Sequence, residues 1–197
     1  MKHKSVLATA MIAGCLVWTA NAQAETPSAK MLAYTCAGCH GTNGTSHGPA
    51  TPTISGNSID YFVEAMEAYK SGERPSTIMG RIAKGYSKEE FELMAAFFAQ
   101  QKFVPAKQKA DRKLASKGKA IHKKSCEKCH EDGGSSSEDD AGILAGQWTP
   151  YLQYSLEDFL DGSRPMPKKM KKKLLKAHKK YGDKGIQALL NYYAGQN

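Results

Sequence analysis

The sequence reads Cys36-Ala37-Gly38-Cys39-His40 in its first half and Cys126-Glu127-Lys128-Cys129-His130 in its second half. The two motifs lie 90 residues apart in a chain of 197 residues. Other identical residues recur at the same offset: Gly56 and Gly146, Tyr61 and Tyr151, Glu67 and Glu157, Gly72 and Gly162, Arg74 and Arg164, Pro75 and Pro165. A register that holds without a gap for roughly forty residues predicts two copies of one domain-sized unit, because solenoid repeats have shorter periods.

Each copy is expected to be built from helices. Apolar residues follow helical spacing over residues 58–71 and 149–160, and Gly72 and Gly162 are expected to end these two helices. Further helices are expected over residues 28–35, 88–101, 114–124 and 184–194. Strand patterns are nearly absent, so the predicted fold is all-α, with a first domain at 25–104 and a second at 105–197.

Residues 1–24 have the features of an export signal. Two lysines precede an apolar run, and Ala22-Gln23-Ala24 has the small-x-small pattern of a signal peptidase site. The mature chain would then begin at Glu25. An alternative interpretation takes Ile12-Ala13-Gly14-Cys15 as a lipoprotein box that would leave a lipid on the cysteine. Both interpretations take the protein out of the cytoplasm, and we expect it in the periplasm.

The composition narrows the class of protein. Hydrophobic residues make up 41% of the chain and charged residues 24%, which favours a packed fold over disorder. Outside the export signal, no apolar run is long enough to cross a membrane. The net charge of +9 would suit nucleic acid, a membrane surface or an acidic protein. The export signal argues against nucleic acid.

Three kinds of chemistry compete for the two Cys-x-x-Cys-His motifs. A zinc site made of both cysteine pairs would place the pairs much closer in sequence, and two disulfides or redox pairs would fit an oxidising compartment. Neither alternative explains the histidine that follows each pair. Covalent haem c explains it, because both thiols attach the porphyrin and the next residue binds iron. We therefore expect two haem groups, attached through Cys36, Cys39, Cys126 and Cys129.

His40 and His130 are the expected iron ligands on one side of each haem. A methionine on the other side would close the iron site and raise its potential, as an electron carrier needs. In the first copy Met79 is expected, because it lies in a loop before a helix. In the second copy the 90-residue offset from Met79 leads to Lys169, one residue before Met170, and therefore favours Met170 over Met166. Met166 also lies in a segment that resembles a ligand loop.

The surroundings of these ligands are less clearly defined by the sequence. A backbone carbonyl near Gly48-Pro49 is expected to accept a hydrogen bond from His40, and no counterpart can be named for His130. Arg74 and Arg164 fit either haem propionates or solvated helix ends. The aromatic side chains Tyr61, Tyr151 and Trp148 fit either propionates or simple packing. Surface positions are expected for the histidines without a repeat partner: His47, His122 and His178.

The chain resembles dihaem cytochromes of the cytochrome c4 type in its two haem motifs and its Gly…Tyr…Gly-x-Arg spacing. The segments Ser76–Ser87 and Leu144–Tyr154, with Arg164-Pro165-Met166 and Lys168-Lys169-Met170, are more particularly similar to the dihaem cytochrome subunits of flavocytochrome c sulfide dehydrogenases. The resemblance covers nearly the whole mature chain. It implies two tandem class I cytochrome c domains.

The resemblance also implies a function. The expected partner is a flavoprotein subunit with bound FAD that oxidises sulfide in the periplasm. This chain would form a heterodimer with it, carry out no bond chemistry itself, and pass the electrons to a soluble acceptor such as a cytochrome. The other hypothesis is a free dihaem carrier that delivers electrons to a terminal oxidase. A run of eight lysines between Lys168 and Lys180 fits either a solvated helix face or a docking surface for an acidic protein.

Overall fold

The computed structural model describes residues 27–138 and 141–196. The expected export signal, its cleavage after Ala24 and the alternative lipid on Cys15 lie outside the described residues. The described helices, in chain order, are α1 (Ala29–Tyr34), α2 (Ala37–His40), α3 (Ile59–Ser71), α4 (Met79–Ala83), α5 (Lys88–Ala99), α6 (Arg112–Ser125), the 3-10 helix η1 (Asp132–Gly134), α7 (Thr149–Asp161) and α8 (Lys168–Ala194). The described residues form helices and loops with no strand, which confirms the all-α prediction.

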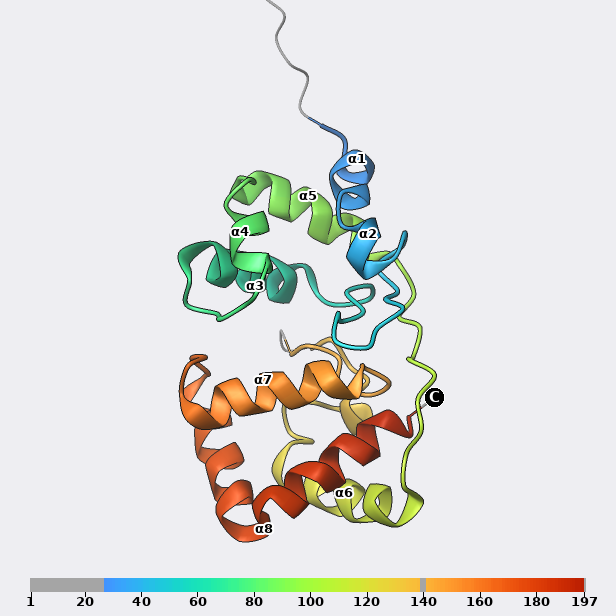
Figure 1. Ribbon diagram of the computed structural model, residues 1–197, viewed down its shortest axis with the longest axis vertical. Helices are drawn as coiled ribbons and strands as arrows, with labels where there is room; N and C mark the ends of the chain where they lie inside the picture. Colours follow the sequence, from blue (N-terminus) through green and yellow to red (C-terminus); the bar gives the residue numbers. More distant parts are fainter. Residues whose placement is uncertain (1–26, 139–140, 197) are drawn as a thin grey trace, which may run out of the picture.

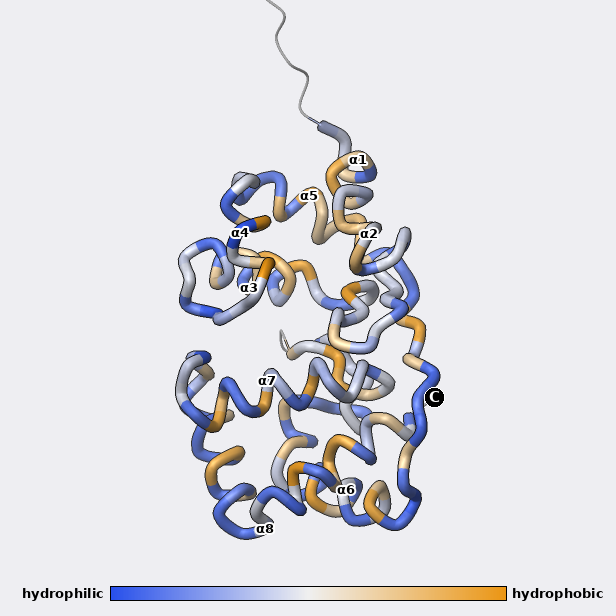
Figure 2. Tube along the Cα trace, in the orientation of Figure 1, coloured by the Kyte–Doolittle hydropathy of each residue, from blue (hydrophilic) through white to orange (hydrophobic). Residues whose placement is uncertain are grey.

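The helices form two groups, one above the other in Figure 1. In the first group α1 packs on α5 and α5 on α3, and in the second α6 packs on α8 and α8 on α7. Residues 101–110 connect the groups without forming a helix. Apolar and polar stretches alternate along the helices in Figure 2. The buried apolar residues form two clusters, one from residues 32–98 and one from residues 121–193. Each half of the chain therefore has its own core.

The duplication is visible in the backbone. α3 and α7 begin and end at positions that are 90 residues apart. Each helix ends at a glycine in the left-handed conformation, with φ of 86° at Gly72 and 83° at Gly162. Residues with a Cβ avoid this conformation, so these glycines end the two helices as expected.

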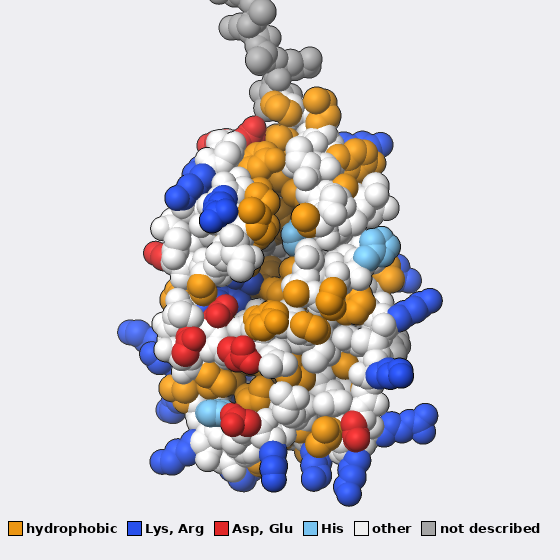
Figure 3. All heavy atoms as spheres, viewed as in Figure 1, with side chains coloured by type: hydrophobic (Ala, Val, Ile, Leu, Met, Phe, Trp, Pro, Cys, Tyr) orange, Lys and Arg blue, Asp and Glu red, His pale blue; other side chains and the backbone are white. Residues whose placement is uncertain are grey.

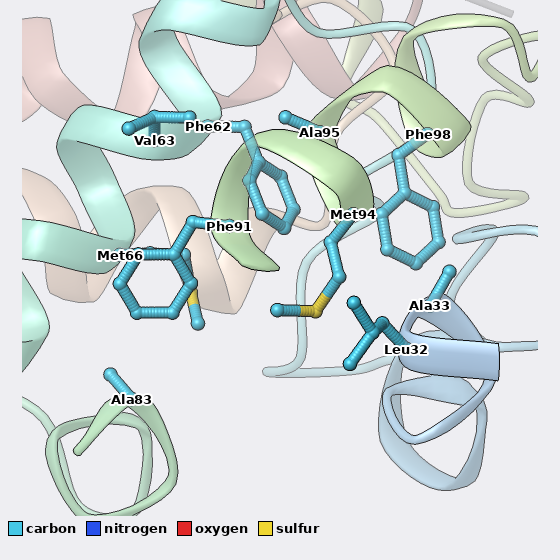
Figure 4. Close-up of a cluster of buried hydrophobic side chains, with 10 residues drawn as sticks. All are labelled: Leu32, Ala33, Phe62, Val63, Met66, Ala83, Phe91, Met94, Ala95 and Phe98. Atoms are coloured by element: carbon cyan, nitrogen blue, oxygen red, sulfur yellow. The ribbon is translucent and has the colours of Figure 1, made fainter. Parts of the chain in front are cut away.

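The first core is rich in aromatic residues. Figure 4 shows ten buried side chains from α1, α3, α4 and α5 that point toward one another. The rings of Phe62 and Phe98 stack with centroids 5.7 Å apart. Phe91 and Met94 of α5 are fully buried within this cluster. Ser87 begins α5 with a capping box to Glu90, so the start of this helix is fixed locally.

The last helix differs from the expectation. Helix was expected only from Lys184, whereas α8 begins at Lys168 and is interrupted at Gly182, where φ is 59°. The reason is a buried stripe that the lysines conceal: Leu174 and Ala177 are buried at helical spacing, three residues apart. Lysine and leucine also have good helix propensity.

Candidate functional sites at the two cysteine motifs

Both Cys-x-x-Cys-His motifs form the same turn of backbone. In the first, the N–H groups of Cys39 and His40 donate to the carbonyl of Cys36 at 3.2 and 2.9 Å. In the second, the N–H groups of Cys129 and His130 donate to the carbonyl of Cys126 at 3.1 and 3.0 Å. Each turn therefore presents two thiols and one imidazole together.

The thiols are unlike those of redox or zinc sites. Cys36 and Cys126 are partly buried against the two cores, while Cys39 and Cys129 are exposed. Burial raises the pKa of Cys36, and it raises the pKa of Cys126 to about 11. Redox and metal-binding cysteines need the thiolate, which a raised pKa disfavours. Within residues 27–138 and 141–196, no three His, Cys, Asp or Glu side chains converge as metal ligands. The two cysteine pairs belong to separate halves of the chain, with Cys36 against the first core and Cys126 against the second.

The histidine of the first motif is held by the backbone. His40 is 8% exposed, and its Nδ1 lies 2.8 Å from the carbonyl oxygen of Pro52. The expected acceptor near Gly48-Pro49 is therefore wrong by a few residues, although it belongs to the same loop. A ring whose Nδ1–H donates to a carbonyl has its Nε2 lone pair free for a metal.

The second motif repeats this arrangement less tightly. The Nδ1 of His130 is buried, and no hydrogen bond of ordinary geometry satisfies it within the described residues. Burial lowers the pKa of His130, and the backbone carbonyl of Gly142 acts in the opposite direction. Gly142 lies 90 residues after Pro52, so the repeat supplies an acceptor that the sequence did not reveal.

The expected methionines lie near the two cores. Met79 is the first residue of α4 and packs, partly buried, against the first core, as Cys36 does. Met166 packs against the second core, as Cys126 does. Met170 is partly buried in the first turn of α8, one helical turn before the buried Leu174.

The first site is shaped for a large apolar group. Ile78 and Ile82, on either side of Met79, are 48% and 38% exposed, although both are apolar. Figure 3 shows hydrophobic side chains lining a hollow between α4 and α2, with a histidine side chain visible inside. Two thiols, a histidine with a free ring nitrogen and an apolar hollow fit haem c.

Sequence comparisons agree with this chemistry. The family model for cytochrome c matches residues 26–102. Over 159 residues the chain is 29% identical to cytochrome c4 of Pseudomonas aeruginosa, a match that covers 76% of the chain and 78% of that protein. The chain belongs to the cytochrome c family. It is an electron carrier of the cytochrome c4-like kind, and its two cysteine motifs indicate two haem c groups.

Two further similarities describe this cytochrome. Over 69 residues it is 48% identical to the "Cytochrome subunit of sulfide dehydrogenase" of Chlorobaculum tepidum, a match that covers 35% of this chain and 62% of that protein. The crystal structure of reduced recombinant cytochrome c4 from Pseudomonas stutzeri matches with a TM-score of 0.74 and 24% identity, covering 86% of this chain and 97% of that one. The second similarity confirms the fold of two tandem cytochrome c domains.

The two halves of the cytochrome bind each other through equivalent residues. The Gln147 side chain accepts from the N–H of Thr53 at 2.9 Å and donates to its carbonyl at 2.8 Å. Asn57, the repeat partner of Gln147, accepts from the N–H of Ile143, the repeat partner of Thr53, at 3.2 Å. Such reciprocal pairing is the mark of a twofold-like interface. The sequence did not lead us to predict these two amide side chains, although their separation of 90 residues matches the repeat.

Tyrosines and arginines meet at the same interface. Arg74 donates to the hydroxyl of Tyr151 at 2.8 Å and lies over the ring of Tyr69, while Arg164 lies over the ring of Phe159. Burial alone would raise the pKa of Tyr151, but Arg74 and Arg164, together with hydrogen bonds to Tyr61 and Ser155, outweigh it and lower the pKa to about 8. Arg74 is 7% exposed, so a solvated helix end is wrong for this residue.

His122 was expected at the surface, and this expectation is wrong. It is 1% exposed, its Nδ1 lies 2.9 Å from the hydroxyl of Tyr193, and its Nε2 lies 2.6 Å from Glu127. It occupies the repeat position of Leu32, which is buried in the first core. That correspondence could have predicted its burial. The second haem site therefore has a polar neighbour where the first has a leucine.

Proposed function

We propose that this cytochrome is the electron-transfer subunit of a sulfide-oxidising flavoprotein complex. It accepts electrons from an FAD-containing subunit and passes them to a soluble acceptor in the periplasm. The observation that carries the proposal is the 48% identity to the cytochrome subunit of sulfide dehydrogenase. This identity is much higher than the 29% to cytochrome c4, although it covers a shorter stretch.

A specific observation also supports a second candidate, a free dihaem carrier. The cytochrome c4 match spans most of both chains, and the fold similarity to cytochrome c4 is of full length. A free carrier needs no permanent partner. The two candidates therefore differ in what stays bound to the cytochrome during purification.

Gentle purification from the native source separates the two candidates. If the first is right, flavin co-elutes with the cytochrome through gel filtration in an equimolar complex, and high salt does not remove it. If the cytochrome elutes at the size of the single chain and without flavin, the first candidate is overturned and the free carrier is favoured.

We further propose His40 and Met79 as the iron ligands of the first haem, and His130 and Met170 as those of the second. Haem iron supplies reversible one-electron chemistry, and histidine–methionine ligation raises its potential. Met79 and Met170 both occupy the first turn of the helix that follows the repeated Gly-x-Arg-Pro segment. Met170 also precedes the buried Leu174 by one helical turn, so the two residues share one face of α8, and Met170 is partly buried there.

Met170→Ala is expected to abolish the methionine–iron charge-transfer band of one haem in the far-red spectrum of the oxidised protein. Met166→Ala is the matched control, because Met166 lies four residues earlier and packs against the second core. It is expected to lower the free energy of unfolding by about 2 kcal/mol while keeping both bands. If Met166→Ala removes the band and Met170→Ala keeps it, our choice of ligand is wrong.

A further inference from the structure

The first half of α8 is a strongly basic surface. Its eight lysines between residues 168 and 180 are all exposed: Lys168, Lys169, Lys171, Lys172, Lys173, Lys176, Lys179 and Lys180. Among residues 27–138 and 141–196, none of these lysines forms an ion pair with a carboxylate. Figure 3 shows basic side chains gathered around the lower part of the molecule, where α6 and α8 lie. The charge is therefore available to a partner.

This charge does not help the helix to form. Positive side chains at Lys168 and Lys169 stand at the N-terminus of α8, where the helix dipole disfavours them. Lysines three and four residues apart also repel one another, at about 0.2–0.5 kcal/mol per pair. A pattern that costs stability is typical of a functional surface.

The basic surface has an apolar centre. Leu175 is 41% exposed, and helical spacing places Lys171, Lys172 and Lys179 around it, four residues before, three before and four after. An apolar centre within a charged rim is the usual anatomy of a protein–protein interface. A solvated charge run needs no exposed leucine.

This basic surface lies on the opposite side of α8 from the second haem site. Met170, Leu174 and Ala177 form the inward stripe of α8, so Leu175 and its lysines lie on the outward face. The two faces are separated by about one helix diameter, roughly 10–12 Å. A protein bound to the outward face would lie close to the second haem site and far from the first.

The charge is unequal between the halves of the chain. Residues 105–197 contain 19 lysines and arginines against 11 aspartates and glutamates, whereas residues 25–104 contain 7 against 8. The segment of the first repeat that corresponds to residues 168–180 is 78–90, and its three basic residues, Arg81, Lys84 and Lys88, stand beside two glutamates. An acidic protein would therefore be steered to the second half.

We propose that the outward face of early α8, centred on Leu175, docks an acidic electron-acceptor protein, so that electrons leave through the second haem. This inference rests on the proposed role as an electron carrier between proteins, and it holds whether electrons arrive from a flavoprotein or from another donor. The lysines steer the acceptor and Leu175 provides its apolar contact. Salt is expected to weaken the encounter.

The test measures electron exit from the dihaem protein after chemical reduction by ascorbate, so it does not depend on the flavoprotein. The probe is oxidised plastocyanin, a small acidic blue-copper protein whose reduction is followed by stopped-flow absorbance. The variant is Lys171→Gln with Lys172→Gln and Lys179→Gln. The matched control is Lys107→Gln with Lys113→Gln and Lys119→Gln, which removes the same charge from exposed positions elsewhere in the second half.

At low ionic strength the α8 variant is expected to react about tenfold more slowly than the wild type and to lose most of its salt dependence. The control is expected to change the rate less than twofold, and oxidation by a cationic cobalt complex should not slow in either variant. Equal slowing in both triple variants would overturn the proposal, since net charge alone would then suffice. Unchanged rates, with loss of binding to phosphatidylserine vesicles, would also overturn it and indicate a membrane surface.

Discussion

Replacing Cys126 and Cys129 together by serine is expected to unfold most of the second half of the chain. Its core has eight buried side chains, and a chain segment of this size rarely folds on so small a core alone. An attached macrocycle supplies the missing apolar contact. Losing it should cost the whole stability of this half, on the order of 5 kcal/mol.

The measurement combines a haem assay with circular dichroism. The haem content should fall by half, and the helical signal by more than half, because α6, α7 and α8 hold most of the described helical residues. Lys128→Ser is the matched control, since this exposed lysine lies between the same two cysteines. It should keep both haems. A protein with one haem that retains full helicity and one cooperative melting transition would contradict this expectation.

Gln147→Ala is expected to separate the unfolding of the two halves. Gln147 is 3% exposed and bonds both the N–H and the carbonyl of Thr53 across the interface. Thr53 is 2% exposed, so its backbone groups would remain buried without partners. The free energy of unfolding is expected to fall by about 2–4 kcal/mol.

Calorimetry of the holoprotein tests this expectation, with one melting transition for the wild type and two for Gln147→Ala. Gln153→Ala is the control, because among the described residues the Gln153 side chain bonds only the exposed Glu157 on its own helix. It should melt like the wild type. A single unshifted transition in Gln147→Ala would show that the reciprocal amide bonds do not hold the halves together.

Features that are local in the sequence could be predicted. Glycines 72 and 162 end α3 and α7 as expected, because the left-handed conformation belongs to the residue itself. The two cysteine turns also followed from their motif. The 90-residue register was sufficient to locate both copies of the repeat.

Features that depend on the packing of distant segments could not be predicted from the sequence. The early start of α8 was hidden because its buried stripe is narrow and lysines surround it. His122 is buried only because α6 packs on α8, next to Tyr193. The carbonyl of Pro52 accepts from His40, and that of Gly142 influences His130, through loops whose path no short motif defines.

The most direct test of the proposed function is an absorption spectrum of the protein purified gently from its periplasm, recorded before and after sulfide is added. We predict that a flavin band bleaches while the bands of reduced haem c appear in the same solution. Haem bands without flavin, and no change on adding sulfide, would contradict the proposal and leave the chain as a free dihaem carrier.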